Sequence, residues 1–122
     1  MLTNAKKKVF NLQRAALLPA ALGSSPPDPD MIYLAMQDKV HQPYRKTLIP
    51  GLTEVLQSMN PSTQPGLLGI CLSGAGPTIL ALATERFEEI AGRIISQFEA
   101  NGISCQWKLL QPAQEGATVD CT

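Results

Sequence analysis

The sequence predicts an α+β fold, in which about four helices pack against a mainly antiparallel sheet of about four strands. Two short apolar runs, residues 67–72 and 79–83, flank a six-residue turn. That turn is too short for a crossover, so the runs should pair as an antiparallel hairpin. Helical periodicity comes before and after the hairpin, and residues 103–110 alternate as a strand does. Helices and strands that are segregated along 122 residues are typical of a single α+β domain.

The first two helices should lie between residues 4 and about 39. The first is expected over 4–22, where Pro19 would end or kink it a turn early. Asp28 has the position of an N-cap, with Pro29 as the first helical residue. Residues 41–46 then form a polar connection that proline should keep extended, and in it His41 is expected to be a hydrogen-bonding residue.

Two more helices should pack against the hairpin. One runs to about Met59, with Leu48 at the start of its apolar face and Pro50 in its first turn. The other should be capped by Thr84 and carries an apolar stripe over residues 87–98. A short last strand is expected at residues 117–119.

Composition excludes several classes of function. Ten basic residues balance ten acidic ones, so no net field attracts nucleic acid or an acidic membrane. No apolar run approaches the ~20 residues of a membrane span, and the N-terminus lacks the pattern of a signal peptide. Three cysteines without CxxC spacing indicate reduced thiols in a cytoplasmic protein, and they predict no metal site.

The turn from Ser73 to Thr78 is a candidate binding loop. Gly74 and Gly76 allow positive φ, and successive N–H groups in such a turn can form a concavity for an anion. The hydroxyls of Ser73 and Thr78 would be further donors. The alternative is a hairpin loop that needs glycine only to reverse direction, and local chemistry does not choose between them.

Two arginines are candidate ligand-binding residues. Arg14 falls on an apolar line of the first helix, between Phe10 and Leu17. A guanidinium there must extend to solvent, find a buried partner or meet the anion of a ligand. Arg45, beside Lys46, has the features of a surface pair when judged by the sequence alone.

Several motifs together resemble a known family. Residues 73–78, Ser-Gly-Ala-Gly-Pro-Thr, resemble the third, glycine-rich motif of the GHMP small-molecule kinases. Residues 10–15, 36–38, 42–45 and 48–52 resemble, in order, the C-terminal half of homoserine kinases. This resemblance covers nearly the whole chain and implies a single GHMP-kinase-like C-terminal domain over residues 1–122.

The resemblance also implies an activity and a set of site residues. The family transfers phosphate from ATP, with Mg²⁺, to the hydroxyl of L-homoserine, a step of threonine biosynthesis. By resemblance, Arg14 and Arg45 hold the carboxylate of the substrate, and both should point into one cleft. Ser73, Gly74, Ala75 and Gly76 would lie near the transferred phosphate, with Thr78 nearest to the reacting group.

The sequence departs from the family in one large respect. It contains neither the nucleotide loop Pro-x-x-x-Gly-Leu-Gly-Ser-Ser-Ala nor the magnesium-site acid, which belong to an N-terminal domain. We therefore expect this chain alone to bind ATP and Mg²⁺ poorly and to be an inactive kinase. Either the sequence is a truncated or split gene product, or it works beside a partner, which could be an N-terminal half or a homo-oligomer. The alternative function is that of a non-catalytic small-molecule-binding or dimerisation module, a pseudokinase fragment.

Overall fold

The computed structural model describes residues 4–39, 42–45 and 47–121, so His41 and Lys46 lie outside the described residues. The described residues form five helices and two strands, which confirms the α+β class. No helix in these ranges is long and apolar enough to cross a membrane. In chain order the elements are α1 (Asn4–Leu22), α2 (Pro29–Ala35), α3 (Gln42–Arg45), α4 (Leu52–Ser58), β1 (Leu67–Leu72), β2 (Ile79–Ala83) and α5 (Phe87–Glu99).

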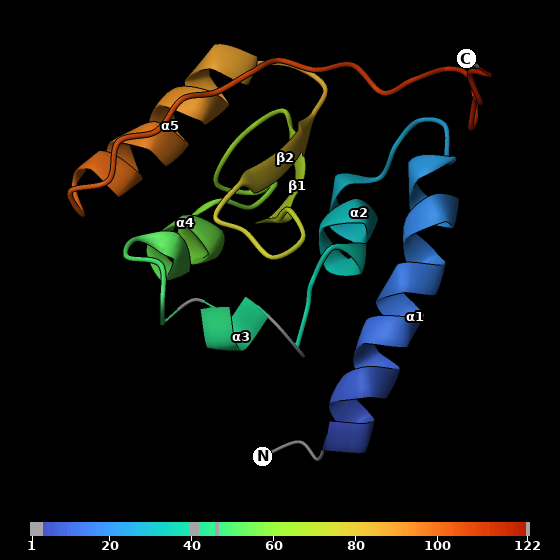
Figure 1. The fold of residues 1–122 in the computed structure, drawn as a ribbon, viewed down its shortest axis with the longest axis horizontal. Coiled ribbons are helices and arrows are strands. Elements are labelled where there is room, and N and C mark those ends of the chain that lie inside the picture. The colour runs from blue at the N-terminus through green and yellow to red at the C-terminus, as the bar shows by residue number, and fades with distance from the viewer. Residues whose placement is uncertain (1–3, 40–41, 46, 122) are drawn as a thin grey trace.

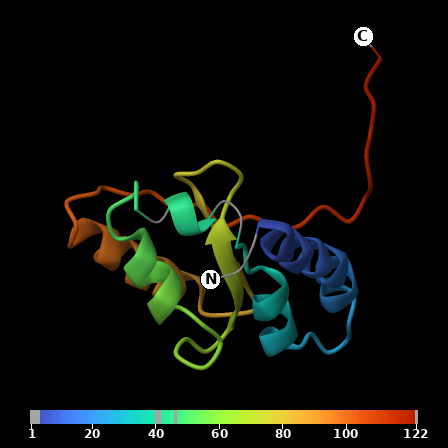
Figure 2. The same cartoon turned by 90° about the horizontal axis from the view of Figure 1, so that it is seen from below.

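The hairpin of β1 and β2 lies between two groups of helices (Figure 1). Helices α4 and α5 lie on one side and α1 and α2 on the other, as the second view also shows (Figure 2). The strands are antiparallel, as predicted, with Leu72 opposite Ile79. A bulge between Leu67 and Gly69 shifts the alternation by one residue, so Leu67 and Ile70 both contribute to the same core.

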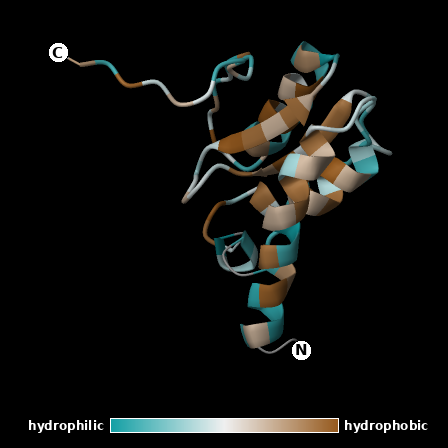
Figure 3. Ribbon diagram, turned by 90° about the vertical axis from the view of Figure 1, so that its right-hand side faces the viewer, coloured by the Kyte–Doolittle hydropathy of each residue, from teal (hydrophilic) through white to brown (hydrophobic). Residues whose placement is uncertain are grey.

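The side of α4 and α5 holds the larger core. The strands are almost continuously hydrophobic (Figure 3), and they meet the apolar stripes of these two helices. Close packing between the strands and the helices keeps water away from these apolar side chains, which stabilises the fold. Nine residues in the described ranges form this cluster: Leu52, Val55, Leu56, Met59, Leu67, Ile70, Leu72, Ile90 and Phe98.

The side of α1 and α2 holds a smaller core, whose buried members are Ala21, Ile32 and Met36. Met36 packs directly onto the backbone of β1. A β-carbon added at Gly69 would lie 2.2 Å from the Met36 sulfur, so only glycine permits this approach. The contact holds the end of α2 against the sheet.

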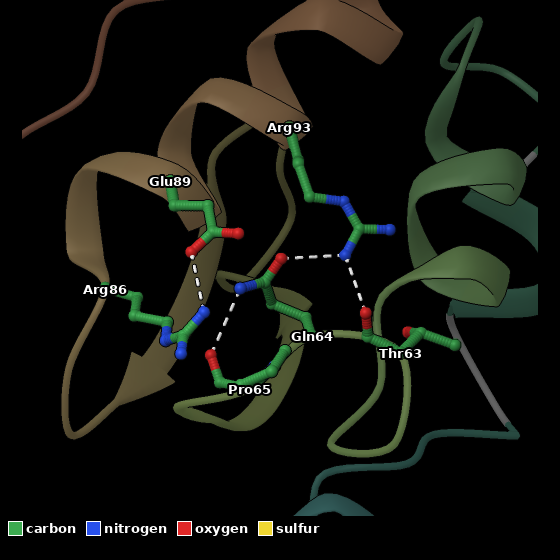
Figure 4. A network of polar contacts seen from close by, with 6 residues as sticks. All are labelled: Thr63, Gln64, Pro65, Arg86, Glu89 and Arg93. Atoms are coloured by element: carbon green, nitrogen blue, oxygen red, sulfur yellow. Dashed lines mark hydrogen bonds and ion pairs between the residues drawn. The ribbon is translucent and has the colours of Figure 1, made fainter.

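A polar network fastens the loop before β1 to α5 (Figure 4). Gln64 is 1% exposed, and its Oε1 accepts a hydrogen bond of 2.7 Å from Arg93. Arg93 also donates to the carbonyl of Thr63, and the Gln64 amide donates to the carbonyl of Pro65. Both ends of the buried amide are therefore satisfied, which avoids the cost of burying a polar group without a partner.

Two expectations before α4 are corrected. Helix α2 ends at Ala35, not near residue 39, because residues 38 and 39 are bound by a side chain of α1. The predicted extended connection contains a helical turn, α3. Pro43 is tolerated there because its missing N–H belongs to the first turn, where no helical acceptor is available.

Two expectations around α4 and α5 are also corrected. Leu48 is 78% exposed and precedes α4, which begins after Gly51. Thr84 does not cap α5: its N–H continues the hairpin by donating to the carbonyl of Gly66 at 3.0 Å. The residue at the N-cap is Arg86, in a left-handed conformation and without a side-chain cap bond.

The prediction of about four strands is wrong, because the described sheet has two. Residues 103–110 and 117–119 form no strand. Ile103 and Cys105 do pack against the larger core, but Trp107 and the residues after it turn outward to solvent. An alternating pattern makes a strand only where a neighbouring strand offers hydrogen bonds, and neither strand of the described sheet pairs with this segment.

Candidate functional site

A cleft of about 130 Å³ lies where the end of α2, helix α3 and the end of β1 meet. Its lining combines apolar walls with one cation, one carboxylate and one amide. A larger cavity of about 310 Å³ shares part of this wall, at Met36, Asp38 and Gln42. The smaller cleft is lined by Met36, Asp38, Gln42, Arg45, Cys71, Leu72 and Gly74.

The hairpin turn lies at one end of this cleft. The Ser73 N–H donates to the carbonyl of Thr78 at 2.8 Å, and the Gly76 N–H donates to the carbonyl of Ser73 at 3.1 Å. Gly76 has φ of 78°, and a β-carbon there would lie 2.1 Å from the Leu72 side chain. Glycine is therefore required by both conformation and space. Ser73, Gly74, Ala75 and Thr78 are exposed, so a ligand can reach them.

Arg45 connects α3 to this turn. Its guanidinium donates a hydrogen bond to the carbonyl of Ala75 and lines the same cleft as Gly74. No ion pair joins Arg45 to a carboxylate among the described residues, although Asp38 lines the same cleft. A guanidinium has five N–H donors, and those not used by Ala75 can bind a carboxylate or a phosphate.

The position of α3 depends on hydrogen bonds at its first residue. The Gln42 N–H donates to Asp38 Oδ2 at 2.9 Å, and Gln42 Oε1 accepts from the Leu72 N–H at 3.0 Å. Asp38 is itself oriented by Asn11 of α1, whose amide donates to Asp38 and accepts from the Lys39 N–H. These contacts link α1, α3 and β1 around the cleft.

Arg14 lies on α1, and its surroundings differ from those of Arg45. Its guanidinium carbon lies 3.7 Å from the centre of the Phe10 ring, and the Lys39 ammonium lies 4.1 Å from the same centre. The Arg14 Nε is buried and has no hydrogen-bond partner among the described residues. Arg14 is not in the lining of either cavity described above, so a cleft shared with Arg45 stays a prediction.

The thiol of Cys71 is part of the cleft wall. Burial raises the pKa of this thiol, and the nearby Asp38 carboxylate raises the pKa further. The thiol is therefore protonated at neutral pH and acts as a small apolar surface.

No group of three or more metal-binding side chains is found in the described ranges. The cleft lining holds a guanidinium and an amide, which can donate hydrogen bonds to an anion, beside the carboxylate of Asp38.

Sequence reasoning missed three residues at the site. Asn11, Asp38 and Gln42 were noted only as parts of motifs, although all three form hydrogen bonds between elements. The predicted second helix included Asp38, so no local signal marked this carboxylate as the cap of the next turn. Nothing in the sequence identified Leu72 as the partner of Gln42.

The fold and the site place the chain in a class of protein. The chain belongs to the GHMP kinases C-terminal family, which matches residues 14–102. It is similar to the homoserine kinase of Saccharomyces cerevisiae, with 70% identity over 112 residues, which cover 92% of this chain and 31% of that protein.

Other homoserine kinases show the same relationship. Identity is 60% over 111 residues to that of Schizosaccharomyces pombe, covering 91% of this chain and 33% of the relative. Identity is 42% over 112 residues to that of Persephonella marina, and these residues cover 92% of this chain and 36% of that protein. The resemblance read from the motifs is thus confirmed, and the chain spans about a third of the length of these relatives.

Proposed function

We propose that this chain is the substrate-holding, C-terminal part of a homoserine kinase. The observation that carries the proposal is its 70% identity to such an enzyme over nearly the whole chain. The reaction would transfer the γ-phosphoryl group of ATP to the hydroxyl of L-homoserine, giving O-phospho-L-homoserine for threonine biosynthesis. The three cysteines in this chain are free thiols, in agreement with a cytoplasmic setting.

Arg45 would bind the carboxylate of homoserine. Its guanidinium lines the cleft and has no described acidic partner, so its remaining donors can form a bidentate pair with a carboxylate. The hydrogen bond to Ala75 fixes one end of the guanidinium without neutralising its charge. Arg14, whose guanidinium carbon lies 3.7 Å from the centre of the Phe10 ring, would complete the carboxylate site when substrate is bound.

The glycine turn would lie beside the transferred phosphoryl group. Homoserine is only a few bonds long, and the contact between Arg45 and Ala75 sets a similar short span between carboxylate site and turn. Thr78 is exposed near the end of the turn and would donate its hydroxyl to the phosphoryl oxygens. Phosphoryl transfer depends mainly on positioning and charge stabilisation, so these contacts can contribute without a general base in this chain.

ATP and Mg²⁺ would be held mainly by a partner half, because this chain offers no phosphate-binding loop of the family. Large apolar side chains in the described ranges support a partner half or a homo-oligomer, since several are mostly exposed. Leu12, Leu48 and Leu110 are exposed by 69%, 78% and 78%. A chain that remains monomeric in sedimentation and binds no hydrophobic dye would argue against such a partner.

A chimera tests the proposal. In it, this chain replaces the matching 112 residues of the Saccharomyces cerevisiae homoserine kinase. We expect the chimera to phosphorylate L-homoserine with ATP, and the chain alone to show no kinase activity. A folded chimera without activity would contradict the proposal and favour a non-catalytic binding module.

Thr78→Ala in the active chimera tests the role of the turn. We expect a lower kcat with a smaller change in KM, because the contact would belong to the transferring group. Ser62→Ala, at an exposed residue outside the cleft, is the control. A change in KM alone would assign Thr78 to substrate binding instead.

A further inference from the structure

We propose that Gln42 is a positioning residue, whose side-chain amide holds helix α3 against the end of β1 and thereby sets the place of Arg45. The proposal rests on the proposed function, because it concerns the residue that would bind the substrate carboxylate. Gln42 itself need not touch substrate. Its effect passes through the position of the α3 turn.

The Leu72 N–H needs a partner outside the hairpin. The Ser73 N–H donates to Thr78, and Leu72 stands opposite Ile79 at the next position along the ladder. Hydrogen-bonded and non-bonded pairs alternate in an antiparallel ladder, so the N–H of Leu72 points away from β2. Leu72 is 8% exposed, and Gln42 Oε1 accepts this N–H at 3.0 Å. The amide therefore takes the place of a neighbouring strand at this edge.

Helix α3 cannot hold its own position. It has four residues, fewer than an isolated helix needs to be stable in water, so outside contacts decide where it lies. Gln42 provides two of them, through its backbone N–H to Asp38 and its side chain to Leu72. A third is the Lys7 ammonium, 5.6 Å from the centre of the Tyr44 ring. The side-chain bond is the one that connects α3 to the strand leading into the glycine turn.

Arg45 follows Gln42 by three residues, so both side chains lie on one side of this single turn. Both line the cleft. Arg45 reaches the turn at Ala75, three residues after Leu72. Two hydrogen bonds thus join α3 to one short stretch of backbone, one before the turn and one within it. Loss of the first leaves Arg45 attached but able to move relative to the cleft.

The test uses three substitutions of Gln42 and one matched control. Gln42→Met keeps the length but removes the acceptor, Gln42→Asn keeps the amide but shortens its reach, and Gln42→Glu restores an acceptor of equal reach. Gln57→Met is the control, because Gln57 is exposed on α4. Hydrogen exchange of the Leu72 amide is measured by NMR in this chain, and KM and kcat for L-homoserine are measured in the chimera.

We expect Gln42→Met and Gln42→Asn to speed Leu72 exchange by about fivefold and to raise KM by about tenfold, with a smaller change in kcat. Gln42→Glu and Gln57→Met should leave Leu72 exchange near wild type. Gln57→Met should also leave KM near wild type, whereas KM of Gln42→Glu should rise, because its carboxylate lies in the cleft with Arg45 and competes with the carboxylate of the substrate. A purely structural role would lower the folded fraction and kcat together and leave KM unchanged.

Leu72 exchange that is equal in Gln42→Met, Gln42→Asn and Gln57→Met would overturn the proposal. Faster exchange with an unchanged KM would also overturn it, since Gln42 would then stabilise the strand edge without positioning Arg45. A chimera that lacks activity with wild-type Gln42 contradicts the proposed function, whereas the exchange rates still show whether the amide holds α3. If Gln42→Met does not fold, Gln42→Asn provides the same comparison with Gln57→Met.

Discussion

The two sides of the hairpin differ in how they are held together. On the side of α4 and α5, nine buried apolar residues form one cluster, and Arg93 fastens the neighbouring loop. On the side of α1 and α2, three buried residues form a small cluster, and hydrogen bonds from Asn11, Asp38 and Gln42 make the remaining connections. The candidate site lies on this second side.

We infer that the apolar side mainly stabilises the fold and that the hydrogen-bonded side mainly orients a ligand. Apolar packing has no preferred direction and leaves little space for movement, so it is suited to stabilising the fold. Hydrogen bonds between short segments fix direction, which a site for a small polar ligand requires. Substitutions on the first side should therefore change stability, and substitutions on the second should change ligand binding.

The largest effect is expected in the larger core. Leu52 and Ile32 are both 0% exposed, and they belong to the larger and the smaller cluster. Leu52→Ala should lower the free energy of unfolding by about 2–5 kcal/mol, and Ile32→Ala should lie near the lower end of that range because fewer buried neighbours surround it. Leu48→Ala, at an exposed residue, should change it by less than about 0.5 kcal/mol.

Urea denaturation measures these three changes. If Ile32→Ala proved as costly as Leu52→Ala, the two sides would be equally important to stability and the contrast would be wrong.

Arg45→Ala should give the largest effect on substrate use. In the chimera we expect KM for L-homoserine to rise by at least about tenfold, since a hydrogen bond to a charged group is worth about 1.5–3 kcal/mol. The urea midpoint should change little, because Arg45 lies at the end of a four-residue helix. Arg86→Ala, which breaks an exposed ion pair with Glu89, is the control and should affect neither quantity. An unchanged KM for Arg45→Ala would assign this arginine to the support of the turn alone.

Arg93→Met should lower stability and leave KM unchanged, which is the reverse of the effect expected for Arg45→Ala. It removes the donor to the buried Gln64 Oε1 and to the Thr63 carbonyl, which should lower the free energy of unfolding by about 1–3 kcal/mol. KM for L-homoserine in the chimera should not change, because the network lies on the side of α5 (Figure 4). Gln64→Met with Arg93→Met should recover part of the loss, since no buried acceptor is then left unpaired. A raised KM would show that the two sides are coupled.

The smallest effect concerns Cys71. Its pKa is raised by burial and then by Asp38, so the thiol gives up its proton less readily in the folded chain than in the unfolded one. The folded state then binds more protons above the ordinary thiol pKa, and this contribution to stability is present below that pKa and is lost as the pH rises through the folded value.

Alkylation by iodoacetamide, which needs the thiolate, measures this shift. The rate at Cys71 should rise at a higher pH in the folded chain than in the chain unfolded by urea, and Asp38→Asn should reduce the difference. Equal pH profiles at Cys71 in the folded and the unfolded chain would show that the cleft wall does not shield this thiol from water.

Local patterns were sufficient for much of the fold. The first helix, the Asp28 cap and both strands of the hairpin have the predicted bounds, because each depends on neighbouring residues. The position of Arg45 beside the glycine turn was implied by family resemblance, and the cleft brings Arg45 and Gly74 together. The roles of Thr78 and of both arginines remain predictions.

Other features could not be read from local patterns. Residues 103–110 have the alternation of a strand but find no strand to pair with in the described sheet, because hydrogen bonding depends on distant segments. Thr84 was expected to cap α5, but the hairpin extends to Thr84 through its N–H to Gly66, and α5 begins only at Phe87. Leu48 satisfies the helical stripe, yet α4 starts four residues later and leaves it exposed.

The sequence by itself determined the hairpin, the long first helix and the conformation of the turn, since apolar runs, good helix formers and glycine act within a few residues. Only the tertiary structure decided where α2 ends, that residues 42–45 form a helical turn, and which backbone group Gln42 meets. These outcomes depend on hydrogen bonds between residues far apart along the chain, 27 residues for Asn11 with Asp38 and 30 residues for Gln42 with Leu72. A hydrogen bond across such a distance forms only after the packed elements bring its donor and acceptor within about 3 Å.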